Sequence, residues 1–354
     1  MKKEVNLMNN NTKYLSVAVI VVAIIGTGVF FTDGEKTNEE IVPIRESVST
    51  TPNNFEIVKK LTGRDIPGEE GVRIEPITVQ GGEGGTVTMQ ALLADNLDTA
   101  GGSISIWVNV ISKGSKVKLL LPGSITEKPE HSGLLVLENS SINSIKDLAG
   151  KKIAVNVLGA EAEFIIKTFL KQNGLSINQV ELVVIPANNQ EQSLRSKQVD
   201  AVAGTTSGGT WFDRAVENGG VRRIPGTSSY EARGKKSLFT TSQGFREDFI
   251  KKYPDTVRKY LKAYDSARRI VWEEYEKDPE RVRKAYGEVL EEKGGNPKLA
   301  RYYRGPRWSP ENQFITDDDI QFWIDNFVES GLIKPGDIKP SDVYTNEFNP
   351  YYKK

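Results

Sequence analysis

"DLAGKKIAVNVLGAEAEFIIKTFLKQNGL", residues 147–175, is the stretch that decides the fold. Its first half contains KKIAVNV, a short apolar run typical of a buried strand, and its second half, EAEFIIKTFLKQNG, has the apolar spacing of an amphipathic helix. Gly159 lies where the expected strand meets the expected helix. Open α/β sheets bind ligands at this kind of corner, outside the carboxyl ends of their strands. The stretch therefore predicts one βα unit and a place to look for a binding site.

The same alternation of strand and helix continues on both sides of this stretch. One series of expected strands and helices runs from residue 71 to 122, and a second runs from 151 to 220. An apolar run at 133–139 separates them, and beyond residue 245 the pattern is mostly helical. Strands that alternate with helices predict a parallel, doubly wound sheet, and two such series predict two lobes of an α/β protein.

The N-terminal segment predicts export from the cytoplasm. Residues 14–31, YLSVAVIVVAIIGTGVFF, carry no charge, and Lys2, Lys3 and Lys13 precede them, so the rest of the chain should face outward. Two interpretations stay open, an uncleaved transmembrane anchor and a cleaved signal peptide. The lack of a small-x-small site after the apolar run favours the anchor. The polar stretch that follows, residues 32–54, lacks apolar periodicity and is expected to be a flexible tether.

Composition excludes several classes of function. The chain of 354 residues has 47 basic and 47 acidic side chains, which gives no electrostatic case for binding nucleic acid. The absence of cysteine excludes disulfides, thiolate metal sites and a cysteine nucleophile. The single histidine, His131, has no companion for a metal site or a catalytic triad. Asp317, Asp318 and Asp319 follow Thr316 in the pattern of a helix N-cap, so we expect neither a metal nor a cofactor.

Several segments together resemble a known family. They are SINSIKDLAGKKIAVNVLGAEAEFIIKTFLKQNGL, VELVVIP, SLRSKQVDAVAG and the closing ITDDDIQFWIDNFVESGLIKPGDIKPSDVYTNEF. In their order and spacing, over most of residues 71–348, they are similar to the nitrate/taurine/aliphatic-sulfonate (NitT/TauT-type) solute-binding proteins of ABC transporters. The resemblance implies a two-lobed, type II periplasmic-binding-protein-like fold, in which two doubly wound, parallel-rich sheets are joined by two crossing strands. The crossings would be 133–139 and 235–245.

The resemblance also implies a domain division and shows two departures. Fewer residues than usual precede the strand at 71–82, so the opening unit of the first lobe is expected to be short or altered. At the glycine corner, Ala160 and Glu161 stand where the family often has serine or threonine. The expected division is an anchor or signal at 1–31, a tether at 32–54, lobe 1 at 55–134 and 240–354, and lobe 2 at 135–239.

The corner at Gly159 has two interpretations. Glycine lets the backbone approach a ligand, and the first N–H groups of the helix could bind an anionic head group. Glu161 would compete for those N–H groups, and could instead accept hydrogen bonds from a ligand amine or amide. Alternatively, Gly159 only forms the turn, and Glu161 and Glu163 complement the helix dipole.

Other expected strand ends carry glycine, hydroxyl and aromatic residues that could line the cleft between the lobes. Trp107 and Trp211 could form its walls, with packing in the lobe cores as the alternative, and the TTSGG segment could instead be a solvated loop. The full set of expected ligand-binding residues is Gln80, Gly81, Gly82, Gly102, Ser103, Trp107, Asn156, Gly159, Ala160, Glu161, Thr205, Thr206, Ser207 and Trp211.

From the resemblance we expect an extracytoplasmic, monomeric solute-binding protein that delivers a small polar organic ligand to an ABC permease and its ATPase. An enzyme or a ligand sensor on the same scaffold is the alternative. A pyrimidine-synthesising enzyme of this type would need cysteines and histidines that the chain lacks. No arginine is clearly directed at the cleft. The basic stretch at residues 301–308, RYYRGPRW, is expected to be a solvated connector or a contact patch. These features favour a zwitterionic or uncharged polar ligand.

Overall fold

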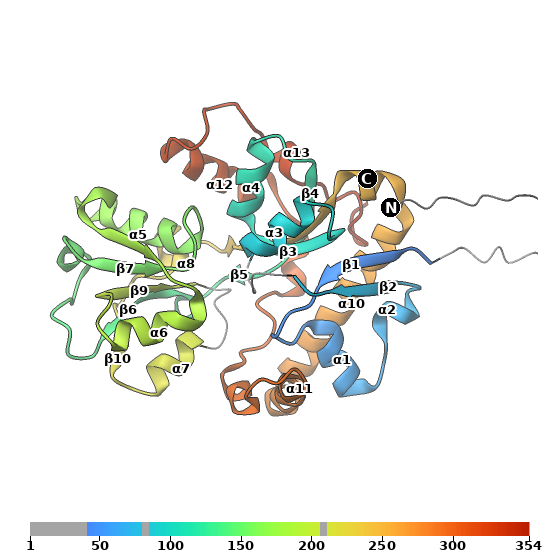
Figure 1. Cartoon of the computed structure of the whole chain (residues 1–354), viewed down its shortest axis with the longest axis horizontal. Coiled ribbons are helices and arrows are strands. Elements are labelled where there is room, and N and C mark those ends of the chain that lie inside the picture. Colours follow the sequence, from blue (N-terminus) through green and yellow to red (C-terminus); the bar gives the residue numbers. More distant parts are fainter. Residues whose placement is uncertain (1–40, 80–84, 206–210, 354) are drawn as a thin grey trace, which may run out of the picture. The chain divides into compact units, whose positions relative to one another are not determined.

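The computed structural model describes residues 41–79, 85–205 and 211–353. Ile41–Lys354 forms one compact unit, and the apolar segment at 14–31 lies outside the described residues. Within the described part of the chain, no helix is long and apolar enough to cross a membrane. Figure 1 labels the helices and strands that follow.

Lobe 2 contains a five-stranded sheet with the order β10-β6-β9-β7-β8 (Figure 1). β7 is parallel to both β8 and β9, whereas β6 runs antiparallel to its neighbours β9 and β10. The sheet is therefore rich in parallel strands but mixed. Its strands are β6 (Gly133–Leu137), β7 (Lys152–Val155), β8 (Glu181–Val184), β9 (Ala201–Gly204) and β10 (Val221–Arg223), and its helices are α5 (Glu161–Gln172), α6 (Ala187–Arg195), α7 (Trp211–Glu217) and α8 (Ser229–Ala232).

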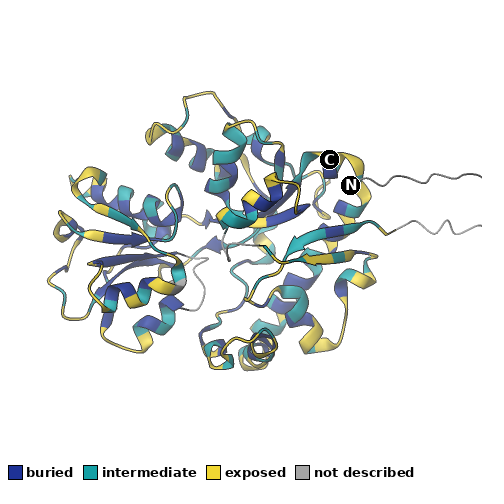
Figure 2. Cartoon of the chain, in the orientation of Figure 1, coloured by how far each residue is buried: buried dark blue, intermediate teal, exposed yellow. Residues whose placement is uncertain are grey.

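Both faces of this sheet are covered, which is why its central strands are apolar without alternation (Figure 2). Ile153 and Val155 of β7 pack with α5, whereas Ala154 between them packs with α6 and α7. Successive side chains of a strand point to opposite faces, so one strand contributes to both apolar clusters. The sequence prediction of a doubly wound α/β lobe is confirmed here.

Lobe 1 is built around the strand order β3-β12-β4, in which β12 is antiparallel to both neighbours. A parallel pair, β1 with β2, continues it, because the N–H of Asp98, just before β3, donates to the carbonyl of Arg45 in β1 at 2.9 Å. The strands are β1 (Pro43–Ser47), β2 (Arg73–Ile77), β3 (Thr99–Ser103), β4 (Val117–Pro122) and β12 (Thr241–Arg246). The helices are α1 (Asn54–Thr62), α2 (Ile66–Glu69), α3 (Gly85–Leu93), α4 (Ile104–Ser112), α9 (Glu247–Lys252), α10 (Pro254–Lys277), α11 (Pro279–Glu292), α12 (Asp317–Glu329) and α13 (Pro340–Val343).

Two sequence expectations about lobe 1 are wrong. The expected tether at 32–54 contains strand β1, whose Ile44 is completely buried. The opening unit was expected to be short or altered, but β1, α1 and β2 form a complete βαβ unit. The sequence pattern did not reveal this strand because Ile44 is its only fully buried residue and its neighbours are proline, charged and polar residues.

The position of the first crossing between the lobes also differs from the expectation. Residues 133–139 were expected to cross, but β6 lies inside the five-stranded sheet. The crossing is formed by β5 (Ile125–Thr126), which pairs antiparallel with β11 (Leu238–Phe239). A strand of two residues is too short to produce a periodic signal in the sequence. The second crossing lies within the expected range of 235–245.

A buried ion pair fixes the lobe 1 end of this crossing. Arg268 of α10 is only 2% exposed, and its Nε and Nη2 donate to Asp265 Oδ1 at 2.9 and 2.5 Å. Its Nη1 donates at 2.6 Å to the carbonyl of Pro122, the last residue of β4. Its guanidinium also stacks on Trp308 at 3.8 Å from the ring centroid. One side chain therefore joins a helix, a strand end and the segment before α12.

We expect Asp98→Asn to destabilise the protein by about 2–4 kcal/mol, because Asp98 is 3% exposed and binds Arg45 with both carboxylate oxygens, which attaches β1 to the sheet. Asp95→Asn is the matched control. The Asp95 side chain is 71% exposed and touches the same arginine, so its replacement should cost less than about 1 kcal/mol. Urea unfolding measures both, and equal losses would contradict the prediction.

Candidate functional site

The candidate site in lobe 2 lies at the carboxyl ends of β7 and β9. These strands are parallel, with Ile153 opposite Ala201 and Ala154 opposite Val202, so the chain leaves both strands at the same edge of the sheet. Asn156, the residue directly after β7, has a buried Oδ1 without a hydrogen-bond partner. Most buried polar atoms in proteins are paired. The edge therefore carries one unmet acceptor, and Trp211, the first residue of α7, has an unmet donor at Nε1.

The glycine corner is held by its own carboxylates. Gly159 has a positive φ of 76°, which favours glycine, and its N–H donates to Glu163 Oε2 at 2.8 Å. Ala160 is the N-cap residue of α5. Glu161 is 3% exposed, and its Oε1 accepts a hydrogen bond from Ser229 Oγ at 2.8 Å. Glu161 thus faces a hydroxyl group of the protein itself.

Ser229 connects Glu161 to the crossing. Its hydroxyl lies 2.9 Å from Ser132 Oγ and 3.3 Å from Thr126 Oγ1, and Thr126 belongs to the crossing strand β5. All of these side chains are buried. A buried carboxylate is stable only with good hydrogen bonds, so this hydroxyl network holds the start of α5 in a fixed relation to β5.

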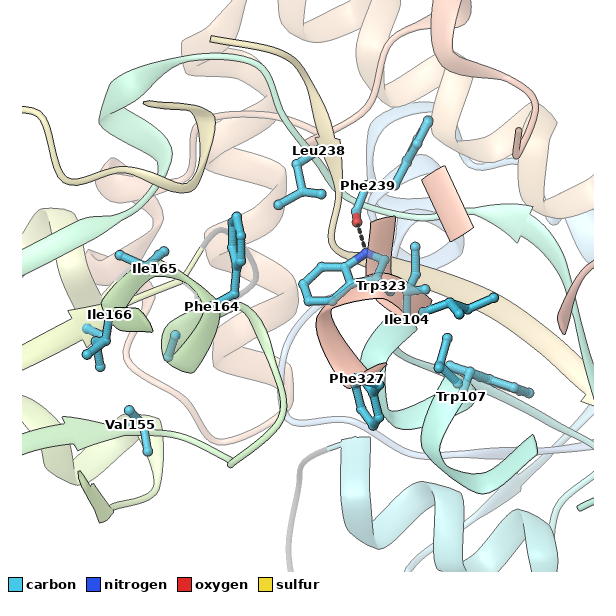
Figure 3. Packing of buried hydrophobic residues seen from close by; sticks show 14 of the residues in the cluster. Ile104, Trp107, Val155, Phe164, Ile165, Ile166, Leu238, Phe239, Trp323 and Phe327 are labelled. Atoms are coloured by element: carbon cyan, nitrogen blue, oxygen red, sulfur yellow. Dashed lines mark hydrogen bonds between the residues drawn. The ribbon is translucent and has the colours of Figure 1, made fainter. Parts of the chain in front are cut away.

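Helix α12 covers one side of the glycine corner. Phe164 of α5 meets Phe322 of α12 edge to face, with ring centroids 4.8 Å apart. Trp323 Nε1 donates to the carbonyl of Phe239 in β11 at 2.9 Å (Figure 3). A side chain added at Gly159 would lie 3.6 Å from Phe327. The cavity between them holds about 20 Å³, which is room for one water molecule and not for an organic ligand.

In lobe 1 the structure places Trp107 in the core. The side chain is completely buried, and a Cβ at Gly244 would lie 2.6 Å from its six-membered ring. Its Nε1 points toward Gly102 and has no hydrogen-bond partner. Ser103 is the N-cap residue of α4, but its side chain makes no capping hydrogen bond. Its hydroxyl lies 2.8 Å from Ser105 Oγ. Trp211 is likewise packed in a core, the apolar cluster under α6 and α7.

The remaining expected residues divide into two groups. Thr205 is buried directly after β9. The residue before it must be glycine, because a side chain at Gly204 would collide with the ring of Phe212. Five others lie outside the described residues: Gln80, Gly81, Gly82, Thr206 and Ser207.

Arg307 was not expected from the sequence. Its carbonyl accepts from the N–H of Ile125 in the crossing strand at 2.7 Å, and its buried Nη1 has no partner. Burial lowers the pKa of Arg307, and the charges of Asp213 and Glu161 partly oppose this effect. The stretch 301–308 is therefore not a solvated connector throughout. Its arginines repeat every third residue, a spacing that could have suggested a charged partner element.

Lobe 1 has a polar cavity of about 430 Å³ next to the loop that follows β1. It is lined by Glu46, Asn53, Asp65 and Lys293, among others. Burial raises the pKa of Glu46 to about 7, although its Oε1 accepts a hydrogen bond from Tyr260 OH at 2.9 Å. This carboxyl group therefore changes its charge near neutral pH.

The other sequence candidates have structural roles. Thr316 and Asp319 form the expected capping box of α12, which confirms that prediction. Arg195 binds Glu191 and backbone carbonyls, and Arg233 lies over the Phe322 ring at 4.8 Å and near Asp319. In the described part of the chain, no group of three acidic or histidine side chains could hold a metal ion.

Comparison with known proteins places these features in a family. A family model described as NMT1/THI5 like matches residues 69–280. A Haemophilus influenzae protein whose name refers to thiamine biosynthesis is 40% identical over 86 residues, which is 24% of this chain. The chain matches only about a quarter, 26%, of that relative's length.

Solved structures establish the two-lobed fold. The aliphatic sulphonate binding protein SsuA of Escherichia coli is 16% identical with a TM-score of 0.63, over 85% of this chain and 91% of that one. The alkanesulfonate-binding protein SsuA of Xanthomonas axonopodis, bound to MOPS, is 17% identical with a TM-score of 0.65, over 86% of this chain and 98% of that one. The nitrate-binding protein NrtA of Synechocystis is 11% identical with a TM-score of 0.65, over 87% of each chain. The expected fold class and family resemblance are confirmed.

We expect Glu161→Ala and Ser229→Ala each to destabilise the protein by about 1–3 kcal/mol, since each leaves a buried partner without its hydrogen bond. In the double variant the two losses should not add, and the coupling energy should be about 1–2 kcal/mol. Chemical unfolding of the four proteins gives this cycle. Full additivity would mean that the contact contributes nothing to stability.

We expect Glu46→Gln to remove a pH dependence. The folded pKa of about 7 lies above the ordinary 4.5, so the native state binds the proton more tightly and loses stability as pH rises between these values. The variant should match wild type near pH 4.5 and exceed it by about 1–3 kcal/mol above pH 7.5. Urea unfolding from pH 4.5 to 8 tests this, and parallel curves would contradict it.

Proposed function

The chain belongs to the NMT1/THI5-like family, and from this premise we propose that it is an extracytoplasmic solute-binding protein. It captures a small polar organic ligand between its two lobes and delivers the ligand to an ABC permease and its ATPase. An N-terminal anchor at 14–31 would keep it at the outer face of the membrane. The solute-binding proteins with the same fold support this class of function.

The unpaired buried polar atoms carry the proposal. Among the described residues these are Trp107 Nε1, Asn156 Oδ1, Trp211 Nε1 and Arg307 Nη1. Each costs about 1–3 kcal/mol while it is without a partner. Asn156 directly follows β7, Trp211 begins α7, and the backbone carbonyl of Arg307 is bonded to the crossing strand β5. A ligand with both donors and acceptors would recover this cost, which makes a binding function the simplest reason to keep these groups.

The crossing supports a mechanism of lobe closure. β5 and β11 have two residues each and pair with each other. Among the described strands, they form a separate two-stranded sheet beside the five-stranded sheet of lobe 2 and the three-stranded sheet of lobe 1. A connection this small bends at a low cost, which is the usual geometry of hinge closure around a ligand. Closure would bring lobe 1 over the carboxyl ends of β7 and β9.

The geometry of the hydroxyl network argues against an enzyme. Ser229 and Glu161 are a hydroxyl and a carboxylate in direct contact beside the glycine corner, but they are 0% and 3% exposed. The serine hydroxyl is also shared with Ser132 and Thr126, and no substrate could reach it. A catalytic base must lie within hydrogen-bond reach of the substrate proton, a condition that this pair does not meet.

The Haemophilus influenzae relative favours a more specific second candidate. Its name refers to thiamine biosynthesis, and the match is 40% identical over 86 residues. A heteroaromatic compound of that pathway would then be the ligand, in place of a sulfonate or a taurine-like zwitterion. The binding mechanism would stay the same.

We expect one class of solute to raise the unfolding temperature of the protein from residue 41 onward. The panel contains alkanesulfonates, taurine, nitrate, bicarbonate, amino acids, pyrimidines and thiamine. A ligand present at one hundred times its dissociation constant adds about 2.7 kcal/mol, equivalent to about 4 °C for a chain of this size. Mass spectrometry of the denatured protein checks for a ligand that was co-purified.

Asn156→Ala tests the site within the same experiment. It removes an unpaired buried acceptor, so the ligand-free protein should keep its stability while the shift caused by the ligand shrinks. Asn218→Ala, at an exposed position after α7 in the same lobe, is the control and should keep the full shift. If no solute shifts wild type and no ligand is co-purified, the proposed function is wrong.

A further inference from the structure

A chain of hydrogen bonds inside lobe 1 connects Glu46 to Gln243. Tyr260 OH donates to Glu46 Oε1 at 2.9 Å, and Gln243 Nε2 donates to Tyr260 OH at 3.3 Å. The same Nε2 donates to Thr99 Oγ1 at 2.7 Å. Tyr260, Thr99 and Gln243 are at most 4% exposed. These bonds, called the Glu46 relay below, join a carboxyl group that lines the lobe 1 cavity to strand β12.

The relay fixes the orientation of the Gln243 amide group. Thr99 Oγ1 gives its hydrogen to the carbonyl of Gly244 at 2.8 Å. Tyr260 gives its hydrogen to Glu46. A hydroxyl group has one hydrogen, so both hydroxyl oxygens can only accept from Gln243, and the amide nitrogen must face them. The amide oxygen, Oε1, faces the other way and has no hydrogen-bond partner among the described residues.

Gly101 leaves an opening in front of this oxygen. It lies directly opposite Gln243 in the β3–β12 ladder, so a side chain at Gly101 would stand on the same face of the sheet. A Cβ there would lie 3.0 Å from Gln243 Oε1 and, in the described part of the chain, would meet no other residue beyond its sequence neighbours within 4 Å. Gly101 is also exposed. The acceptor without a partner therefore faces an open recess and not the core.

The recess lies where lobe 1 continues into the crossing. β12 starts at Thr241, two residues after Phe239, which ends the crossing strand β11. Thr241 pairs with Ser103 at the carboxyl end of β3, and Gly101 and Gln243 are the pair two residues further in. The pairing of β12 with β4 shifts register directly after Gln243. Such bulges are frequent next to functional sites, where they redirect a side chain. In the proposed lobe closure, a ligand would meet lobe 1 here.

We propose that Gln243 is a ligand-contacting residue of lobe 1 whose Oε1 accepts a hydrogen bond from the ligand, and that Glu46, acting through Tyr260, strengthens this acceptor when it is ionised. Each hydrogen bond in a chain polarises the next, so the negative charge on Glu46 increases the negative charge on Oε1. Glu46 and Tyr260 are positioning residues and do not touch the ligand. The inference rests on the proposed function and adds a contact and a pH dependence to it.

The surroundings of Glu46 determine the direction of this pH dependence. The charged and titratable groups near its carboxyl group come from the elements packed around β1: Tyr260 and Tyr264 of α10, Glu56 of α1, Asp65 before α2, Arg73 of β2 and Lys293 after α11. Lys293 binds Glu56 at 2.7 Å. Burial raises the pKa of Glu46 to about 7, so its charge changes near neutral pH. Ligand affinity should rise as the pH increases through this value, because only the ionised carboxylate strengthens the acceptor.

The relay is tested without a ligand, by NMR of the Gln243 side-chain amide in protein that carries isotopically labelled glutamine. The resonance is assigned by its absence in Gln243→Leu, or in Gln243→Asn if the leucine variant does not fold. We expect its chemical shift to change in one step near pH 7 in wild type, and Glu46→Gln and Tyr260→Phe to lose this step. Tyr264→Phe removes a hydroxyl group from the same aromatic cluster outside the relay, so this matched control should keep the step.

Two matched pairs of probes test the contact: taurine with ethanesulfonate, and uracil with dimethyluracil, in which both nitrogens are methylated. The first member of each pair has an N–H donor that the second lacks. We expect at least one donor-carrying probe to move the Gln243 resonance and to raise the unfolding temperature. Its affinity should fall about 3- to 10-fold in Gln243→Leu or Gln243→Asn, the effect of losing one neutral hydrogen bond. Between pH 6 and pH 8 its affinity should rise about two- to fivefold in wild type and stay constant in Tyr260→Phe.

Three results would overturn the proposal: a Gln243 resonance without a step near pH 7, a step that persists in Glu46→Gln or Tyr260→Phe, or no donor-carrying probe that moves this resonance. A solute that raises the unfolding temperature of wild type and of the Gln243 variant alike would refute the contact. That last result would leave the proposed solute-binding function intact, so the two can fail separately.

Discussion

The buried guanidinium of Arg268 is the contact on which the geometry of the crossing depends. It binds Asp265 within α10, donates to the last carbonyl of β4 and stacks on Trp308. β5 begins three residues after Pro122, and Arg307 directly precedes Trp308. Because a buried ion pair repays its desolvation only when its geometry is good, this network tolerates little displacement. The hinge strand and Arg307 therefore share one rigid support in lobe 1.

Arg268 and Arg307 show how the same residue type can have opposite roles in one region. Arg268 contacts groups of the protein itself: a carboxylate, a carbonyl and an aromatic ring. Arg307 has its backbone fixed just as firmly, but its Nη1 is left without a partner. Burial lowers the pKa of both groups, yet in Arg268 the adjacent Asp265 opposes this shift through a direct hydrogen bond. The contrast separates an arginine whose donors are met by the protein from one that keeps a buried donor without a partner.

The sequence predicted the parts of the fold in which local and tertiary preferences agree. β7 and β9 are apolar runs, and α5 has the apolar spacing of a helix. The structure has each element where its pattern indicated. β1 and β5 were missed because one is polar around a single buried isoleucine and the other has two residues. Their pairing energy comes from partners distant in the chain, β2 and β11, which no local pattern contains.

The candidate site was less predictable for the same reason. Asn156, Trp107 and Trp211 were proposed from their positions at or near strand ends, and all three have unpaired buried atoms. Whether they touch a ligand stays a prediction. Arg307 lies in a stretch without apolar periodicity, and its carbonyl accepts from Ile125 of β5, a contact that forms only in the folded chain. The sequence could suggest charge at this position, but it could not show that one donor of the guanidinium is buried.

The contacts around α12 show how the proposed lobe closure would be compatible with a well-packed core. α12 packs on α4 of lobe 1 and, through Phe322 and Trp323, on Phe164 of lobe 2. Apolar contacts are not directional, so aromatic rings can slide over one another at a small cost. The buried directional bonds lie elsewhere, inside lobe 2 at Glu161 and at the crossing. At the surface, Lys167 and Lys171 of α5 also bond Ser330 and Glu329 at the end of α12, and closure would have to exchange these bonds for water. Closure can therefore shear the aromatic contact while the hydroxyl network keeps α5 fixed to β5, so that the corner and the crossing move as one body.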